Sequence, residues 1–309
     1  RLEPFWLEGP PAVQTLSPTV HNLLGGVPCV VRGTRCCDMG EQVPTTRNGG
    51  ARGGSLLRLL CLHGHGGSGE KLCGQLERRF LRAARAEELG ADALDVQCRC
   101  IDAPFAEPSR RRDGRQWWRY DEGGEGDRPE DWAEMERAAT RLAEELHASP
   151  TPYDGVLGFS QGAEMVHTMA VLAHRGDPRF LGPRAPRFGI SLSGAVNPGH
   201  FEAPGGGGPP RGCPGPRAGP SGGDCKEVAA VGQKLGMPVL FLGDWAQDSW
   251  YSARRFDETL ALYADATKVV HGQRHSVPDL GPDSAVSVRS FFTRFSGGVG
   301  GGTSTDTSR

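Results

Sequence analysis

The chain has 309 residues with a formal net charge of -2, so its charge gives no reason to expect a nucleic-acid or anionic-membrane partner. It contains no run of about 18 apolar residues, so no membrane span is predicted. Its 46 glycines and 24 prolines gather in a few segments, so the folded core should be shorter than the chain.

Residues 1–55 are predicted to be a leader of uncertain structure. They mix glycine, proline and arginine with one weakly apolar stretch, which is a poor core for a signal peptide. Because the chain begins at Arg1 rather than Met, we expect a fragment or a processed protein. A transit peptide fits this segment as well as a mispredicted leader does, so targeting to an organelle stays open.

Strand and helix patterns alternate over residues 56–296, which predicts one α/β domain. Strands are expected at 56–63, 94–105, 153–159, 186–194, 237–243 and 267–271, and helices at 70–89, 127–146, 160–176, 251–263 and 283–295. The strands are continuous apolar runs, which indicates a mostly parallel sheet with helices on both faces. In such sheets, ligands bind at the carboxyl ends of the strands.

Two segments do not fit this alternation. A Gly/Pro-rich insertion at 204–224 cannot form a core element, and we expect it to be a mobile flap near the site. Residues 297–309 are rich in glycine, serine and threonine, and we expect a disordered tail.

The nine cysteines do not form a zinc-binding CxxC…CxxC pattern. Cys61, Cys98 and Cys100 lie within apolar runs, where a thiol behaves as a small buried hydrophobic group. We therefore predict a reducing compartment, the cytoplasm. His63 and His65 have no third ligand nearby, so they are expected to shape a loop rather than to bind a metal ion.

The strongest motif is GFSQG at 158–162, which lies between an apolar strand and a helix. GxSxG alone is weak in a glycine-rich chain, but this context is that of a nucleophile elbow. A serine on such a turn has a strained backbone, and flanking glycines let the strand and the helix approach closely. Ser160 is therefore the predicted nucleophile.

A serine nucleophile needs a base and an acid, in the chain order Ser…Asp/Glu…His. His275 lies between the last predicted strand and the last helix, so it is the predicted base, whereas His271 is expected to end the strand. Asp244 and Asp248 both follow the strand at 237–243. Either could instead cap the next helix, so the local sequence leaves the two aspartates nearly even.

An oxyanion hole requires backbone N–H donors aimed at the substrate carbonyl oxygen. One predicted donor is the N–H of Gln161, directly after the nucleophile. The other is expected from His65 or Gly66, in the turn HGHGG at 63–67.

The same turn supports a rival interpretation. Gly64, Gly66 and Gly69 spell GxGxxG after a strand, which is the fingerprint of a dinucleotide site and nearly that of a Walker A loop. The acid that such a site needs would be Asp102, which comes somewhat late. A nucleotide site would also leave GFSQG and His275 unexplained.

Trp117 and Trp118 form an aromatic pair in a charged loop. Such rings more often belong to a core or a pocket wall than to the catalytic groups. We assign this pair to substrate binding.

The assembled segments resemble the "family of serine hydrolases". The matching segments are LCLHGHGGSG, DAPF, WWRYDE, YDGVLGFSQGAEM, ISLSG, VLFLGDWAQDSW and HGQRHSVP, which together cover most of 56–295. In that family the acid lies 27 residues before the histidine, which selects Asp248 over Asp244. Family members usually have GxxDxxV at the acid turn, whereas this chain has GDWAQDSW, so Asp244 is kept in reserve.

The resemblance implies an α/β-hydrolase fold and hydrolysis of carboxylic esters, including long-chain acyl esters or thioesters, through an acyl-enzyme on Ser160. It implies no metal and no organic cofactor, and a small-molecule acyl ester or thioester as the partner. The sequence does not determine the oligomeric state. The alternative is a hydrolase-fold protein kept for binding without catalysis, against which the complete Ser-Asp-His set argues.

Overall fold

The structure, a computed structural model, describes residues 56–84, 95–107, 112–119, 129–196 and 234–296. The predicted leader, the Gly/Pro-rich insertion and the predicted tail lie outside these ranges. Within the described ranges, no helix is both long enough and apolar enough to cross a membrane.

Six parallel strands form the main sheet, in the order β2–β1–β5–β6–β7–β8. They are β1 (Leu56–Leu62), β2 (Asp95–Ile101), β5 (Gly155–Phe159), β6 (Phe188–Leu192), β7 (Val239–Gly243) and β8 (Ala266–Val270). A separate antiparallel hairpin pairs β3 (Phe105–Ala106) with β4 (Arg115–Gln116). Because the six strands run in one direction, their carboxyl ends meet at one edge of the sheet.

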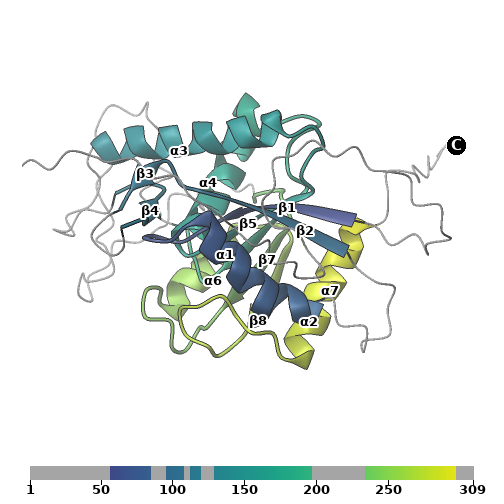
Figure 1. The fold of residues 1–309 in the computed structure, drawn as a ribbon. Helices are drawn as coiled ribbons and strands as arrows, with labels where there is room; N and C mark the ends of the chain where they lie inside the picture. Colours follow the sequence, from purple (N-terminus) through teal and green to yellow (C-terminus); the bar gives the residue numbers. More distant parts are fainter. Residues whose placement is uncertain (1–55, 85–94, 108–111, 120–128, 197–233, 297–309) are drawn as a thin grey trace, which may run out of the picture. The chain divides into compact units, whose positions relative to one another are not determined.

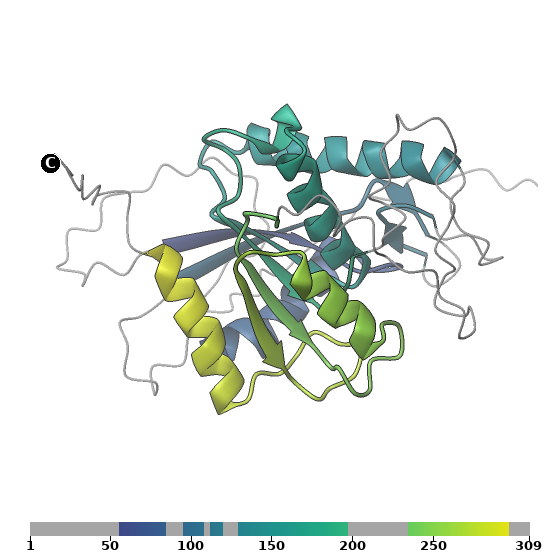
Figure 2. The same ribbon diagram turned by 180° about the vertical axis from the view of Figure 1, so that it is seen from behind.

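Helices cover both faces of this sheet (Figures 1 and 2). They are α1 (Gly69–Gln75), the π-helical segment η1 (Leu76–Leu81), α2 (Arg82–Ala84), α3 (Pro129–Ala148), α4 (Gln161–His174), the 3-10 turn η3 (Pro178–Phe180), α6 (Ala253–Ala261) and α7 (Pro282–Ser296). Helices α1, α2 and α7 lie on one face, and α3 and α4 lie on the other. This is the predicted α/β-hydrolase arrangement.

Successive side chains of each central strand point to opposite faces of the sheet, so each strand contributes to a core on both faces. In β7, Leu240 and Leu242 belong to the cluster that includes α1 and α7, whereas Val239 and Phe241 face α4 and α6. In α3, Met135, Ala139, Leu142 and Leu146 recur at helical spacing and are all buried against the sheet. Both faces of the central strands are therefore covered, as the continuous apolar runs predict.

The edges of the sheet differ from the prediction. In β2 and β8, buried and exposed side chains are interspersed, because an edge strand has one neighbouring strand and less helix above it. The helix predicted at 70–89 also differs, since its second half continues as the π-helical η1 before α2. Residues 85–89 lie outside the described part of the chain.

A polar network is buried beneath helix α4. His167 is fully buried; its Nδ1 lies 2.6 Å from the Tyr263 hydroxyl and its Nε2 lies 3.0 Å from Ser191 Oγ. The Ser191 hydroxyl donates to the Gly194 carbonyl at 3.2 Å. Because its proton is used there, Ser191 Oγ accepts a hydrogen bond from His167 Nε2–H. His167 Nδ1 then accepts from the Tyr263 hydroxyl. This pattern requires a neutral imidazole, and burial accordingly lowers the pKa of His167 to about 3.

This buried histidine should make the fold sensitive to acid. An unfolded histidine has a pKa of about 6.5, so between about pH 6.5 and pH 3 the unfolded chain binds a proton that the folded chain does not. The stability that neutral His167 provides above pH 6.5 is therefore lost as the pH falls, by about 1.4 kcal/mol per pH unit. We expect the unfolding free energy of the wild type, measured in urea, to fall by roughly 2–3 kcal/mol more between pH 6.5 and 4.5 than that of His167→Gln. Equal falls in the two proteins would show that His167 is not the titrating group.

Candidate active site

The GFSQG segment forms a sharp turn from β5 into α4. Ser160 has φ 54° and ψ -119°, a conformation that costs energy for any residue with a side chain. The positions on either side must be glycine because a side chain there would clash with the backbone. A Cβ on Gly158 would lie 2.1 Å from the Gly162 carbonyl oxygen, and one on Gly162 would lie 2.2 Å from the Leu62 carbonyl oxygen. The turn therefore fits only this spacing of small residues, and it presents Ser160 at the carboxyl edge of the sheet.

The structure brings Ser160, His275 and Asp248 together from three loops at this edge. His275 Nε2 lies 2.8 Å from Ser160 Oγ, and His275 Nδ1 lies 3.0 Å from Asp248 Oδ2. The Asp248 side chain is fully buried and the His275 side chain is 12% exposed. A buried carboxylate on Nδ1 fixes the tautomer that leaves Nε2 free to accept a proton from the serine hydroxyl.

Asp248 also accepts two backbone hydrogen bonds within its own loop. Its Oδ1 accepts from the N–H groups of Trp250 at 2.8 Å and Tyr251 at 3.0 Å. The loop is tied further to α4, because the Tyr251 hydroxyl donates to Glu164. The carboxylate is thus fixed in orientation before it meets the imidazole. The sequence alone predicts no role for either residue, although Glu164 lies in the matching segment YDGVLGFSQGAEM.

Asp244, the reserve candidate for the acid, lies elsewhere. Its Oδ1 accepts from Ala246 and Gln247 N–H, and its Oδ2 accepts from Arg274 N–H at 2.7 Å. Burial would raise the pKa of Asp244, but these backbone donors outweigh that effect and lower it. Asp244 therefore joins the loop after β7 to the loop that carries the histidine, and the residue it holds there directly precedes His275.

His271 follows the end of β8, as its sequence position predicts. Its backbone N–H donates to the Gly243 carbonyl at 3.2 Å, and its Nδ1 accepts from Gln273 N–H at 3.1 Å. Burial lowers the pKa of this imidazole. His271 thus shapes the loop, and the hydrogen bond to Ser160 is made by His275.

The turn at 63–67 lies directly beside Ser160. A Cβ on Gly64 would lie 3.0 Å from Ser160 Cβ. The hairpin holds the turn from the other side, since Gly66 N–H donates to the Arg115 carbonyl at 2.8 Å. That bond corrects the part of the prediction that offered Gly66 as an oxyanion donor, because its N–H is already used. His65 remains the candidate for the backbone oxyanion donor in this turn. Its side chain contacts the hairpin, where Nε2 lies 3.1 Å from Gln116 Oε1.

The tryptophan pair lies in the core, which corrects the substrate-binding role predicted for it. Trp117 and Trp118 are 0% and 2% exposed and pack between the sheet and α3. Their backbone instead clamps the side chain of Gln161: Trp117 N–H donates to Gln161 Oε1 at 2.8 Å, and Gln161 Nε2 donates to the Trp118 carbonyl at 2.7 Å. The Trp117 indole also donates to the His63 carbonyl at 2.8 Å. The pair therefore fixes Gln161, the residue that follows Ser160.

The nucleotide and metal interpretations find no geometric support in the described residues. Gly69 N–H at the start of α1 donates to Asp102 at 2.7 Å, so a phosphate there would meet a carboxylate. His63 is engaged with backbone groups, accepting from Ala103 N–H at 3.0 Å through Nε2, and burial lowers its pKa. Within the described ranges, no group of three or more His, Cys, Asp or Glu side chains is arranged to hold a metal ion.

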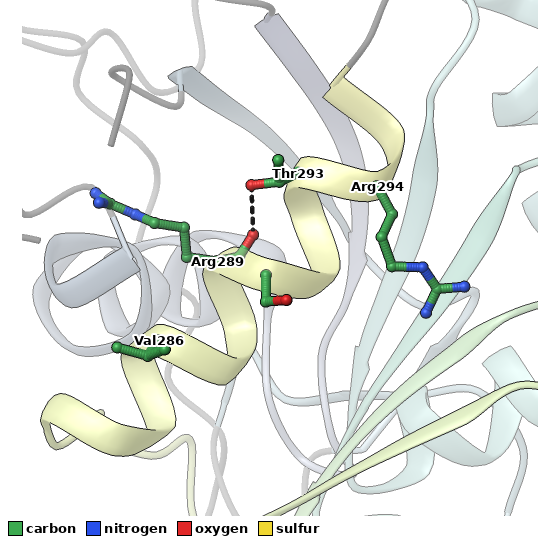
Figure 3. Close-up of a pocket in the computed structure, with 5 residues that line it drawn as sticks. Val286, Arg289, Thr293 and Arg294 are labelled. Carbon is green, nitrogen blue, oxygen red and sulfur yellow. Dashed lines mark hydrogen bonds between the residues drawn. The ribbon is translucent and has the colours of Figure 1, made fainter. Parts of the chain in front are cut away.

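Two cavities lie at the surface of the described residues. One of about 520 Å³ lies on the outer face of α7, lined by Val286, Arg289, Ser290, Thr293 and Arg294 (Figure 3). None of Ser160, Asp248 and His275 lines it. The other, of about 330 Å³, is lined by residues 63–68, Lys71, Leu72, Gln75 and Phe159. The Phe159 ring lies 5.4 Å from that of His275, so this smaller cavity adjoins the candidate site.

The curated proteins similar to this chain are named esterase OVCA2. Esterase OVCA2 of Bos taurus is 34% identical over 157 residues, which cover 45% of this chain and 64% of the bovine protein. Esterase OVCA2 of Xenopus tropicalis is 30% identical over 154 residues, covering 44% and 61% of the two chains. The chain therefore spans less than two thirds of the length of these relatives.

Solved structures with a similar chain path include acyl-protein thioesterase 2 of Zea mays, with 18% identity, a TM-score of 0.48 and coverage of 80% of this chain and 96% of that one. A carboxylesterase of Bacillus cereus matches at 15% identity with a TM-score of 0.44, over 77% and 88% of the two chains. The family model described as "Serine hydrolase (FSH1)" matches residues 54–285, about three quarters of the chain. The chain thus belongs to the FSH1 serine hydrolase family.

Proposed function

We propose that this protein hydrolyses carboxylic esters or thioesters through an acyl-enzyme on Ser160, with His275 as the base and Asp248 as the acid. The observation that carries the proposal is the continuous chain of hydrogen-bond distances, 2.8 Å from Ser160 Oγ to His275 and 3.0 Å from His275 to Asp248. Membership of the serine hydrolase family and the name esterase given to its relatives support the same chemistry.

In the first half of the reaction, Ser160 Oγ attacks the substrate carbonyl carbon while His275 Nε2 takes the serine proton. A bond forms between Oγ and carbon, and negative charge develops on the carbonyl oxygen. His275 then gives its proton to the oxygen or sulfur of the leaving group as the bond to carbon breaks. Asp248 stabilises the imidazolium that exists between these two proton transfers.

In the second half, water attacks the acyl-enzyme. His275 takes a proton from the water, a bond forms from the water oxygen to carbon, and the bond to Ser160 Oγ breaks as the proton returns to the serine. The acid product leaves and the enzyme is restored, so the cycle needs no metal and no organic cofactor. We propose the N–H groups of Gln161 and His65 as the donors to the oxyanion.

The test combines covalent labelling with a substrate panel. A fluorophosphonate probe should label the native protein, and mass spectrometry of the digest should find the adduct on Ser160. A series of p-nitrophenyl esters and acyl-CoA thioesters of increasing chain length should then distinguish esters from thioesters and short from long acyl groups.

Failure of the probe to label native protein, together with no turnover across the panel, would favour the alternative, a hydrolase-fold protein that binds without catalysis. Labelling at a different serine would reject Ser160 and keep the enzyme class. Cytoplasmic localisation stays a prediction from the cysteine content.

A further inference from the structure

Three aromatic side chains surround the imidazole of His275. The ring of Phe159 lies 5.4 Å from it, and the rings of Trp250 and Tyr251 each lie 5.9 Å from it, measured between centroids. Phe159 and Tyr251 are partly buried, whereas Trp250 is 46% exposed. Trp250 is thus the ring that presents a large apolar surface to solvent beside the base.

The position of Trp250 is fixed relative to the triad. Its backbone N–H donates to Asp248 Oδ1 at 2.8 Å, and the other oxygen of the same carboxylate binds His275. The neighbouring residue Tyr251 is anchored to Glu164 on α4. The backbone that carries the indole is therefore held by the group that orients the base, and the side chain itself is not part of the proton pathway.

The proposed reaction defines which part of a substrate comes close to this indole. His275 Nε2 must pass its proton to the leaving atom, so that atom lies within hydrogen-bond reach of the imidazole. The groups attached to the leaving atom then extend past the rings that flank His275. The proposed oxyanion donors would direct the carbonyl oxygen instead toward the turn at 63–67, which lines the 330 Å³ cavity.

We propose that Trp250 is a specificity-determining residue that binds the alcohol or thiol portion of the substrate and favours leaving groups with a flat, apolar surface. This inference rests on the proposed esterase function and deepens it. An indole offers a large rigid apolar face, and stacking against an aromatic or extended apolar group removes that face from water.

The test separates the leaving group from the acyl group. The leaving group is present only during acylation. The value of kcat/KM reports the acylation step, even when deacylation limits kcat. We compare 2-naphthyl acetate with methyl acetate, which differ only in leaving group, and methyl octanoate with methyl acetate, which differ only in acyl group. Taking ratios of kcat/KM for wild type and variant cancels the intrinsic reactivity of each ester.

Trp250→Ala should lower the naphthyl-to-methyl ratio by about 5- to 30-fold and should change the octanoate-to-acetate ratio by less than about twofold. Trp250→Phe keeps an aromatic face and should retain most of the wild-type preference. An unchanged naphthyl-to-methyl ratio, or a larger change in the acyl ratio, would overturn the assignment. Failure of the proposed function is distinguishable, because wild type would then neither turn over any ester nor react with the fluorophosphonate probe.

Discussion

Replacing Ser160 with alanine should lower kcat for ester hydrolysis by about four to six orders of magnitude and abolish fluorophosphonate labelling. The reason is that alanine leaves His275 and Asp248 in place but removes the atom that bonds to the substrate carbon. The residual rate should come from the oxyanion donors and from binding alone. The measurement is the initial rate with a p-nitrophenyl ester, corrected for spontaneous hydrolysis.

The fold should survive this change, because a methyl group is smaller than the serine side chain and the strained turn is kept by its glycines. The thermal melting temperature of Ser160→Ala provides the control. A variant that melts like wild type and retains full activity would reject the proposed mechanism as a whole.

Replacing Asp248 with asparagine should lower kcat by about 10³- to 10⁴-fold. The asparagine oxygen should keep the site of Asp248 Oδ1, where it accepts from Trp250 and Tyr251 N–H. Its NH₂ group would then face His275 Nδ1 at the site of Oδ2, 3.0 Å away. An amide donor at that position stabilises the tautomer with its proton on Nε2, which cannot accept the serine proton. The loss should persist at every pH of a kcat/KM profile, because it comes from the wrong tautomer of His275 rather than from its protonation.

Asp244→Asn provides a matched control on the same loop. It should lose the bond from Arg274 N–H and cost roughly 1.5–3 kcal/mol of unfolding free energy, while kcat falls by less than about tenfold. Urea unfolding and steady-state rates on both variants separate the two roles. A greater loss of kcat in Asp244→Asn than in Asp248→Asn would transfer the acid role to Asp244.

Much of the frame could be predicted because it depends on patterns along the chain. The apolar runs of β1, β5, β6 and β7 indicate buried parallel strands, and parallel strands bring their following loops to one edge. That reasoning alone places Ser160, the two aspartates and His275 near one another. It leaves Asp244 and Asp248 nearly even, because the choice depends on how a loop turns back, and no periodicity describes a loop.

The features of the site that could not be predicted depend on contacts between distant segments. The role of Trp117 is an example: an aromatic pair before a helix gives no sign that its backbone will clamp the side chain of Gln161. The engagement of Gly66 by Arg115 likewise depends on a two-stranded hairpin too short to carry a pattern. Such side-chain to backbone contacts are set by tertiary packing, so they appear only when the structure is known.

Among the described residues, the three non-glycine residues with positive φ are Ser160, Ser193 and Arg274. Arg274 directly precedes His275, and the Ser193 hydroxyl donates to the carbonyl of Ser276, which directly follows His275, at 3.3 Å. A backbone held in such a conformation costs on the order of 1–3 kcal/mol, whereas a whole domain is stable by only about 5–15 kcal/mol. Replacing Ser160 with glycine would relieve that cost and remove the proposed nucleophile in the same step. Stability and activity therefore oppose each other at this edge of the sheet, and variants selected only for a higher melting temperature should be drawn toward less active proteins.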